Sequence, residues 1–145
     1  MKYLVTGGMG FIGHKVSSYL SEFGKVDIVD SLTDYGIIPR AELDELITER
    51  LQYVTRCTFM HNDIRQLTML GLEYDTVIHM AAFPRAKVVN NDPVHGSSVL
   101  IGGLLNLLIQ AQQTGVSRFV YVSSSMVYGD FDNNTTRSEE HTSEL

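Results

Sequence analysis

The stretch "VTGGMGFIG", residues 5–13, is the most informative part of the sequence for the fold, because a short apolar run stops at glycines and a helical pattern follows. Glycines at 7, 10 and 13 allow a tight strand-to-helix turn, close approach of a pyrophosphate and close packing of the helix on the sheet. The first N–H groups of that helix and its positive dipole end would bind phosphates. A glycine cluster alone could serve packing only, but this one lies between a strand and a helix at the start of the domain, which favours dinucleotide binding.

Along the rest of the chain, apolar runs that predict buried strands alternate with segments of helical periodicity. The predicted strands cover residues 2–6, 25–30, 53–60, 75–82 and 117–124, and the predicted helices cover 10–24, 39–52, 64–72 and 93–114. This alternation predicts an α/β fold with a doubly wound parallel sheet of the Rossmann type. The composition becomes polar near residue 131, so we expect a domain over 1–132, truncated after about its fifth strand, and a disordered tail over 133–145.

The composition limits the classes of function. A chain of 145 residues with 43% hydrophobic and 19% charged residues is a single globular domain. Its net charge of −6 argues against nucleic acid and anionic membranes as partners. The single cysteine, Cys57, excludes an internal disulfide, lacks the neighbours of a metal site and is expected to be a buried structural thiol. We see no run of membrane-spanning length and no signal peptide, so we expect a cytoplasmic protein without a metal.

Asp30 ends the second predicted strand, close to the offset of about 20 residues at which an acid binds the adenosine ribose. A carboxylate there accepts hydrogen bonds from both ribose hydroxyls and repels a 2′-phosphate. No Arg or Lys follows before Arg40, so the sequence favours NAD over NADP. A solvated acid at a strand end is the alternative interpretation.

A second informative stretch is "FVYVSSSMVYGD", residues 119–130, in which a buried strand ends in three serine hydroxyls. Such hydroxyls are typical of an active site at the carboxyl edge of a sheet. They could also only satisfy backbone groups at the end of the strand.

Five motifs in order, "TGGMGFIG", Asp30, "NDIR" (62–65), "VIHMAAFPR" (77–85) and "FVYVSSSMVYGD", resemble the extended short-chain dehydrogenase/reductase family. Within it the likeness is to NDP-sugar epimerases of the UDP-glucose 4-epimerase type, and it covers about residues 1–132. Members of this family oxidise a sugar hydroxyl by hydride transfer to bound NAD, and epimerases return the hydride to the other face. The resemblance implies these cofactor-binding residues: Gly7, Gly10, Phe11, Ile12, Gly13, Asp30, Asp63, Ile64, Ala81, Ala82 and Ser123.

The resemblance also implies the catalytic residues. The family's catalytic Ser or Thr lies four residues before the Tyr of the "VYG" turn, which is Ser124 here, and Ser125 is a second substrate contact. The base should be a Tyr with a Lys four residues later, because the ammonium lowers the pKa of the phenol. None of the seven tyrosines has a Lys at that position.

The last residues, "RSEEHTSEL" (137–145), resemble a one-frame translation of a sequencing adapter. We therefore expect this chain to be an inactive N-terminal fragment, and its gene to continue into a substrate domain. The full-length protein is expected to bind a nucleotide sugar and could form a homodimer. A sugar 4,6-dehydratase is the nearest alternative, although Ser125 and Met126 stand where dehydratases carry Asp-Glu. Another extended-family oxidoreductase and a non-catalytic NAD-binding module are the remaining alternatives.

Overall fold

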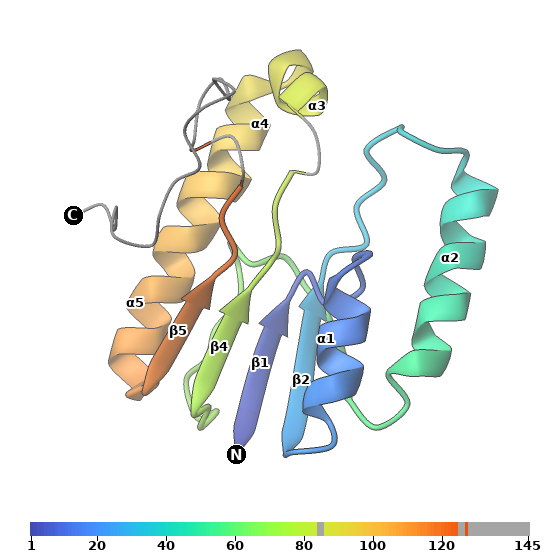
Figure 1. Cartoon of the computed structure of the whole chain (residues 1–145). Coiled ribbons are helices and arrows are strands. Elements are labelled where there is room, and N and C mark those ends of the chain that lie inside the picture. The colour runs from blue at the N-terminus through green and yellow to red at the C-terminus, as the bar shows by residue number, and fades with distance from the viewer. Residues whose placement is uncertain (84–85, 125–126, 128–145) are drawn as a thin grey trace, which may run out of the picture.

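The computed structural model describes residues 1–83, 86–124 and 127. Within them, five parallel strands form one sheet in the order β3-β2-β1-β4-β5, shown in Figure 1. The strands are β1 (Lys2–Thr6), β2 (Lys25–Asp30), β3 (Thr58–His61), β4 (Thr76–His79) and β5 (Arg118–Tyr121). The chain order reverses direction between β1 and β4, so a topological switch point lies at the carboxyl ends of these two strands.

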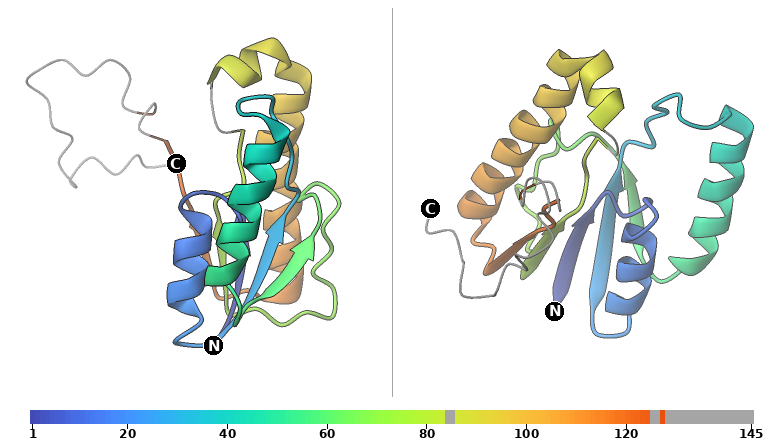
Figure 2. Two further views of the ribbon diagram at one scale, coloured as in Figure 1. Left: turned by 90° about the vertical axis from the view of Figure 1, so that its right-hand side faces the viewer. Right: turned by 45° about the horizontal axis from the view of Figure 1, so that its top comes forward.

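Helices cover both faces of this sheet. The helices are α1 (Gly13–Leu20), α2 (Arg40–Tyr53), α3 (Ala86–Asn91), α4 (Pro93–Ser97), a π-helical turn η1 (Ser98–Gly103) and α5 (Leu104–Thr114). In Figure 2, α1 and α2 lie on one side of the sheet, and the continuous α4–η1–α5 helix lies on the other. This arrangement confirms the predicted doubly wound α/β fold.

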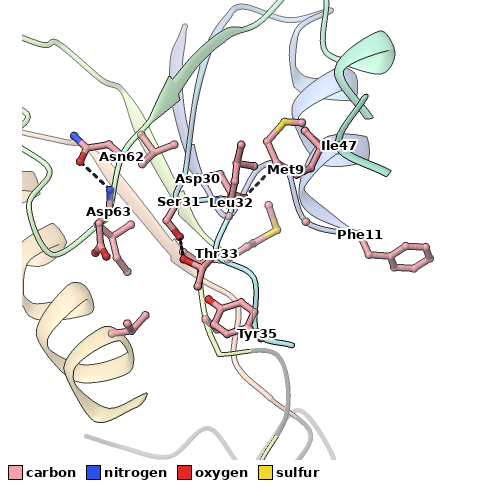
Figure 3. A pocket seen from close by; sticks show the side chains of 18 of the residues that line it. Met9, Phe11, Asp30, Ser31, Leu32, Thr33, Tyr35, Ile47, Asn62 and Asp63 are labelled. Carbon is pink, nitrogen blue, oxygen red and sulfur yellow. Dashed lines mark hydrogen bonds between the residues drawn. The ribbon is translucent and has the colours of Figure 1, made fainter. Parts of the chain in front are cut away.

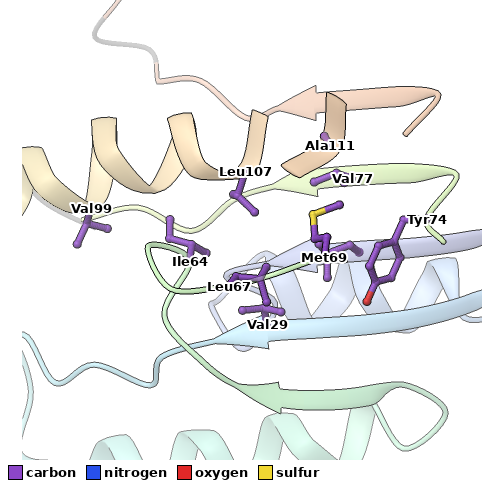
Figure 4. Packing of buried hydrophobic residues seen from close by; sticks show 10 residues of the cluster. Val29, Ile64, Leu67, Met69, Tyr74, Val77, Val99, Leu107 and Ala111 are labelled. Atoms are coloured by element: carbon purple, nitrogen blue, oxygen red, sulfur yellow. The ribbon is translucent and has the colours of Figure 1, made fainter. Parts of the chain in front are cut away.

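Two hydrophobic clusters fix the helices to the sheet. In β1, Leu4 belongs to the cluster with Leu107 of α5, whereas Tyr3 and Val5 belong to the cluster with Met9. Successive strand residues point to opposite faces, so a strand covered on both sides must be apolar throughout. Figure 4 shows the α5 side of this core.

The helix predicted over residues 64–72 is wrong, since this segment forms turns. Its apolar residues Ile64, Leu67 and Met69 are nevertheless buried. Side chains of α5 replace the hydrogen bonds of a helix: Asn106 Nδ2 donates to the carbonyls of Ile64 and Leu67, and the Met69 N–H donates to Gln110 Oε1. A buried segment can thus remain non-helical because its backbone is satisfied from outside.

Several boundaries also differ from prediction. The strand predicted from residue 53 begins at Thr58, because α2 continues through Tyr53, and α1 is shorter than the predicted 10–24. Helix α3 was not predicted. The turn at residues 10–12 leaves the start of α1 at Gly13, which places its first amides beside the glycine cluster.

The helical run Pro93–Thr114 corrects the expectation that no segment reaches membrane-spanning length. Its 22 residues are long and apolar enough to cross a membrane, with a mean hydropathy of 1.4. One face nevertheless packs on the sheet through Val99, Leu107 and Ala111, although only 22% of the apolar stretch is buried. Length and composition alone therefore do not indicate a membrane span here.

Cys57 is half-buried rather than fully buried. Its Sγ donates a hydrogen bond to the Ser17 carbonyl, with 3.5 Å between the two atoms. Burial raises the pKa of the thiol. Cys57 therefore joins the segment before β3 to α1.

Candidate cofactor-binding site

The glycine turn sits on the carboxyl end of β1 and touches the end of β4. Gly7 has a left-handed backbone (φ +69°), and a Cβ there would lie 2.6 Å from the Ala81 nitrogen. A Cβ on Gly13 would collide with the Gly7 carbonyl and would lie 2.7 Å from the Gly8 Cα. The turn closes through a 3.0 Å hydrogen bond from the Gly10 N–H to the Gly7 carbonyl. Side chains at positions 7 and 13 would therefore destroy this conformation.

The turn presents amide groups at the start of α1. Within the part of the chain that the structure describes, no hydrogen-bond acceptor contacts the N–H groups of Phe11, Ile12 or Gly13. The first amides of a helix have no partner within the helix and carry its positive dipole end. They fit an anionic group such as a phosphate.

Asp30 lies at the end of β2, directly beside this turn. Its Oδ2 accepts a hydrogen bond from the Met9 N–H at 3.0 Å, and its Oδ1 accepts one from the Leu32 N–H at 2.9 Å. Leu32 has a left-handed backbone (φ 50°), which is unusual for a residue with a side chain. The carboxylate is therefore held in one orientation and keeps free lone pairs for further donors.

A cavity of about 360 Å³ opens between these elements. Figure 3 shows Asp30 between Met9 on one side and Asp63 on the other, with Tyr35 at the edge. Eight of the residues predicted to bind the cofactor line this cavity: Gly7, Gly10, Phe11, Asp30, Asp63, Ile64, Ala81 and Ala82. The structure thus brings together residues that are up to 75 positions apart in the chain.

Ala81 and Ala82 follow β4 and form one wall of the cavity. The Ala81 N–H contacts Thr6 Oγ1 at 3.4 Å, and the same oxygen is 2.7 Å from Nδ1 of His79. His79 is only 2% exposed, and burial lowers its pKa to about 4. A neutral imidazole therefore joins the ends of β1 and β4 near neutral pH.

Asp63 lies at the opposite wall, in the turn after β3. Arg65 donates to both of its carboxylate oxygens, through Nε at 3.0 and 3.1 Å and through Nη2 at 2.6 Å. These hydrogen bonds lower the pKa of Asp63, although partial burial opposes them. Ile64 is buried in the core below. Asp63 therefore stays an anionic hydrogen-bond acceptor at the rim of the cavity.

Ser123 and Ser124 follow β5 at the same edge of the sheet and are exposed. Neither lines the cavity, and neither do Ile12 and Gly13, which lie on the turn itself. The Ser124 carbonyl accepts a 3.2 Å hydrogen bond from the Val127 N–H. Ser125 lies outside the described residues, as do Tyr128 and the segment 133–145.

The sequence of the chain matches the family described as "NAD dependent epimerase/dehydratase family" over residues 3–145. The chain is a member of the NAD-dependent epimerase/dehydratase family. It is 34% identical over 137 residues to the UDP-glucose 4-epimerase of Neisseria meningitidis serogroup C, with 89% of this chain and 38% of that protein covered.

Solved structures of epimerases and dehydratases have the same fold. A UDP-glucose-4-epimerase from Stenotrophomonas maltophila, with bound NAD and formylated UDP-arabinopyranose, matches with a TM-score of 0.75 and 31% identity over 94% of this chain and 40% of that one. DesIV, a dTDP-glucose 4,6-dehydratase from Streptomyces venezuelae with NAD and TYD bound, matches with a TM-score of 0.72 and 33% identity over 91% and 42%. The chain thus spans about two fifths of the length of these relatives.

The structure adds residues to the site of this family member that the sequence did not indicate. Arg50 of α2, Tyr35 of the loop after β2, and His95 of α4 all line the cavity. The ring of Phe83 lies 4.9 Å from that of Tyr35 and 5.2 Å from that of His95, measured between centroids. Tyr35, Arg50 and His95 lie on segments without a family motif, so only the fold brings them to the cavity.

Proposed function

We propose that this chain is the NAD-binding part of a nucleotide-sugar epimerase that acts by transient oxidation of a sugar hydroxyl. The observation that supports this most is the cavity at the switch point, where Gly7, Gly10 and Phe11 of the glycine turn line the same space as Asp30. NAD bound there would supply the hydride acceptor. The binding domain in this proposal is residues 1–132, and the protein is cytoplasmic.

Each part of the cavity has a separate task in the proposal. The amides of Phe11, Ile12 and Gly13 bind the pyrophosphate, and the lack of a side chain at Gly7 and Gly10 lets it approach. Asp30 accepts hydrogen bonds from the two ribose hydroxyls through its remaining lone pairs. Two backbone donors already fix the orientation of its carboxylate. Asp63 and Ile64 would lie beside the adenine, and the backbone of Ala81 and Ala82 would lie along the cofactor on the side toward β5.

The serines lie on the side toward which the cofactor would extend. Ser123 would contact the cofactor, Ser124 would hydrogen-bond the sugar oxygen that loses its proton, and Ser125 would contact the substrate. A Tyr–Lys base supplied by the rest of a longer protein would take up the proton. The nucleotide sugar and a homodimer belong to that longer protein.

A dehydratase is the second candidate, because DesIV shares 33% identity and the same fold with this chain. The residues after Ser124 are Ser125 and Met126, which cannot act as an acid/base pair for elimination of water. This sequence feature favours the epimerase.

The test is calorimetric titration of the purified 145-residue chain with NAD and with NADP. The proposal requires saturable binding of NAD that is tighter than that of NADP, and tighter binding of NADP would contradict it. In a protein encoded by the gene extended at its 3′ end, Ser124→Ala should lower kcat for epimerisation by about 10²- to 10⁴-fold while the Kd for NAD is unchanged. Full activity of this variant would remove Ser124 from the mechanism.

A further inference from the structure

One residue of the glycine turn is held from three directions. The side chain of Met9 is 2% exposed and packs in the cluster on the α1 and α2 side of the sheet. Its N–H donates to Asp30, and its carbonyl accepts a 2.7 Å hydrogen bond from Nη1 of Arg50. The peptide groups on both sides of Met9 therefore have a fixed orientation.

The direction of the Met9 carbonyl matters for α1. In a helix extended backwards, this carbonyl would accept a hydrogen bond from the amide four residues later, which is that of Gly13. In the structure the carbonyl is bound by Arg50, and the Gly13 N–H has no acceptor among the described residues. The carbonyl that a longer helix would use for this amide is thus held by Arg50, and the Gly13 amide is available for an anion at the start of α1.

We propose that Arg50 is a positioning residue for the dinucleotide: from α2 it orients the Met9 carbonyl and so keeps the first amides of α1 free for the phosphates. This inference rests on the proposed NAD-binding function. Arg50 is half-buried and lines the cavity, 41 residues after Met9 in the chain. Helix α2 buries none of its residues fully, and it meets the turn through this hydrogen bond and through Ile47, which packs against the cluster that contains Met9.

The same helix offers a matched control. Arg40 forms an ion pair with Asp44 at 2.8 Å, and the two side chains are 58% and 55% exposed. It carries the same charge on the same helix and does not line the cavity. An effect of the protein's net charge, or of a weakened α2, should therefore also appear in Arg40→Met.

The experiment measures dissociation constants of adenosine, ADP and NAD for the wild-type chain, Arg50→Met and Arg40→Met. Adenosine lacks the phosphates, so only ADP and NAD depend on the amides of α1. We expect Arg50→Met to raise the Kd of ADP and NAD about five- to tenfold and to leave that of adenosine unchanged. Arg40→Met should change none of the three.

An equal loss of affinity for adenosine and for ADP in Arg50→Met would overturn the proposal, because the pocket as a whole would then have been damaged. Unchanged affinity for ADP would also overturn it. If Arg50→Met does not fold, Arg50→Lys retains the charge and N–H donors but lacks the planar guanidinium. It should raise the Kd of ADP about two- to threefold, again without effect on adenosine. A wild-type chain that binds neither ADP nor NAD would instead contradict the proposed function.

Discussion

The two ends of the sheet differ in how their polar groups are used. At the amino end, the Lys2 N–H donates to Asp75 Oδ2 at 2.7 Å and the Tyr74 hydroxyl donates to Asp27 Oδ2 at 2.9 Å. The Lys2 ammonium lies 3.4 Å from the same oxygen of Asp27 and 4.6 Å from the centre of the Tyr74 ring. Donors and acceptors are thus matched within the protein at this end.

At the carboxyl end, the structure contains a cavity, and the amides of Phe11, Ile12 and Gly13 have no acceptor among the described residues. Unmatched polar groups lower stability unless water or a ligand satisfies them. Polar groups at the amino end are thus satisfied within the protein, whereas amides at the carboxyl end are left without an acceptor among the described residues. A substitution at the amino end should therefore change stability without changing NAD binding, whereas one at the carboxyl end should change binding.

The largest effect is expected for Gly13→Val, because a Cβ at this position collides with the Gly7 carbonyl. We expect a loss of about 3 kcal/mol or more in the free energy of unfolding, together with loss of NAD binding. Urea unfolding followed by circular dichroism measures the free energy of unfolding. The control is Gly102→Ala, whose Cβ would meet no atom within 4 Å. Its free energy of unfolding should lie within about 1 kcal/mol of that of the wild type.

The stability should also depend on pH through His79 at the carboxyl end of β4. Its pKa falls from 6.5 to about 4 on folding, because burial disfavours the charged form. Between these values the unfolded chain binds a proton that the folded one does not, so stability decreases as pH falls from 6.5 to 4, by up to about 3 kcal/mol.

Urea midpoints across this pH range test the dependence on His79. His79→Gln should flatten the slope, whereas His61→Gln, at an exposed position, should retain it. An unchanged slope in His79→Gln would mean that other groups cause the loss of stability.

Asp30→Ala should weaken the binding of NAD by about 1.5–3 kcal/mol and reduce the preference for NAD over NADP. The carboxylate that accepts from the ribose hydroxyls and repels a 2′-phosphate is then absent. Calorimetric titration with both cofactors measures this. The variant also loses two internal hydrogen bonds of the carboxylate, so its unfolding must be measured in parallel. A retained preference for NAD would assign the discrimination to another residue.

The smallest effect is expected at the amino end. Tyr74→Phe removes the hydrogen bond to Asp27 and should lower the free energy of unfolding by about 1 kcal/mol. The Kd for NAD should not change, because Tyr74 lies at the other end of the sheet from the cavity. A weaker affinity for NAD in this variant would contradict the separation of the two ends.

The part of the fold next to the glycine turn was predictable because its signals are local. Strands β1 and β2 have the predicted bounds, 2–6 and 25–30, since each is an apolar run with a clear end. The segment 64–72 was not predictable in the same way. Its apolar spacing is typical of a helix, but Asn106 and Gln110, about 40 residues later, satisfy its backbone.

The residues of the site also differ in whether a local motif indicates them. Gly7, Gly10 and Asp30 could be placed at the cavity from motif spacing. Arg50 could not, because nothing within α2 distinguishes it from Arg40, and only the packing of α2 beside the turn brings it to Met9. Sequence patterns therefore indicate the residues that meet the ligand through local motifs and miss those that act across the fold.

Because Cys57 contacts Ser17 of α1, the reactivity of its thiol should report when α1 separates from the segment before β3. Because only the thiolate reacts and burial raises the pKa of this thiol, a disulfide reagent should modify it mainly when α1 separates from the segment before β3. The sequence contains no second cysteine, so the labelling rate belongs to one site. Slower labelling in the presence of NAD would measure, without any mutation, how strongly the occupied turn holds α1 on the sheet.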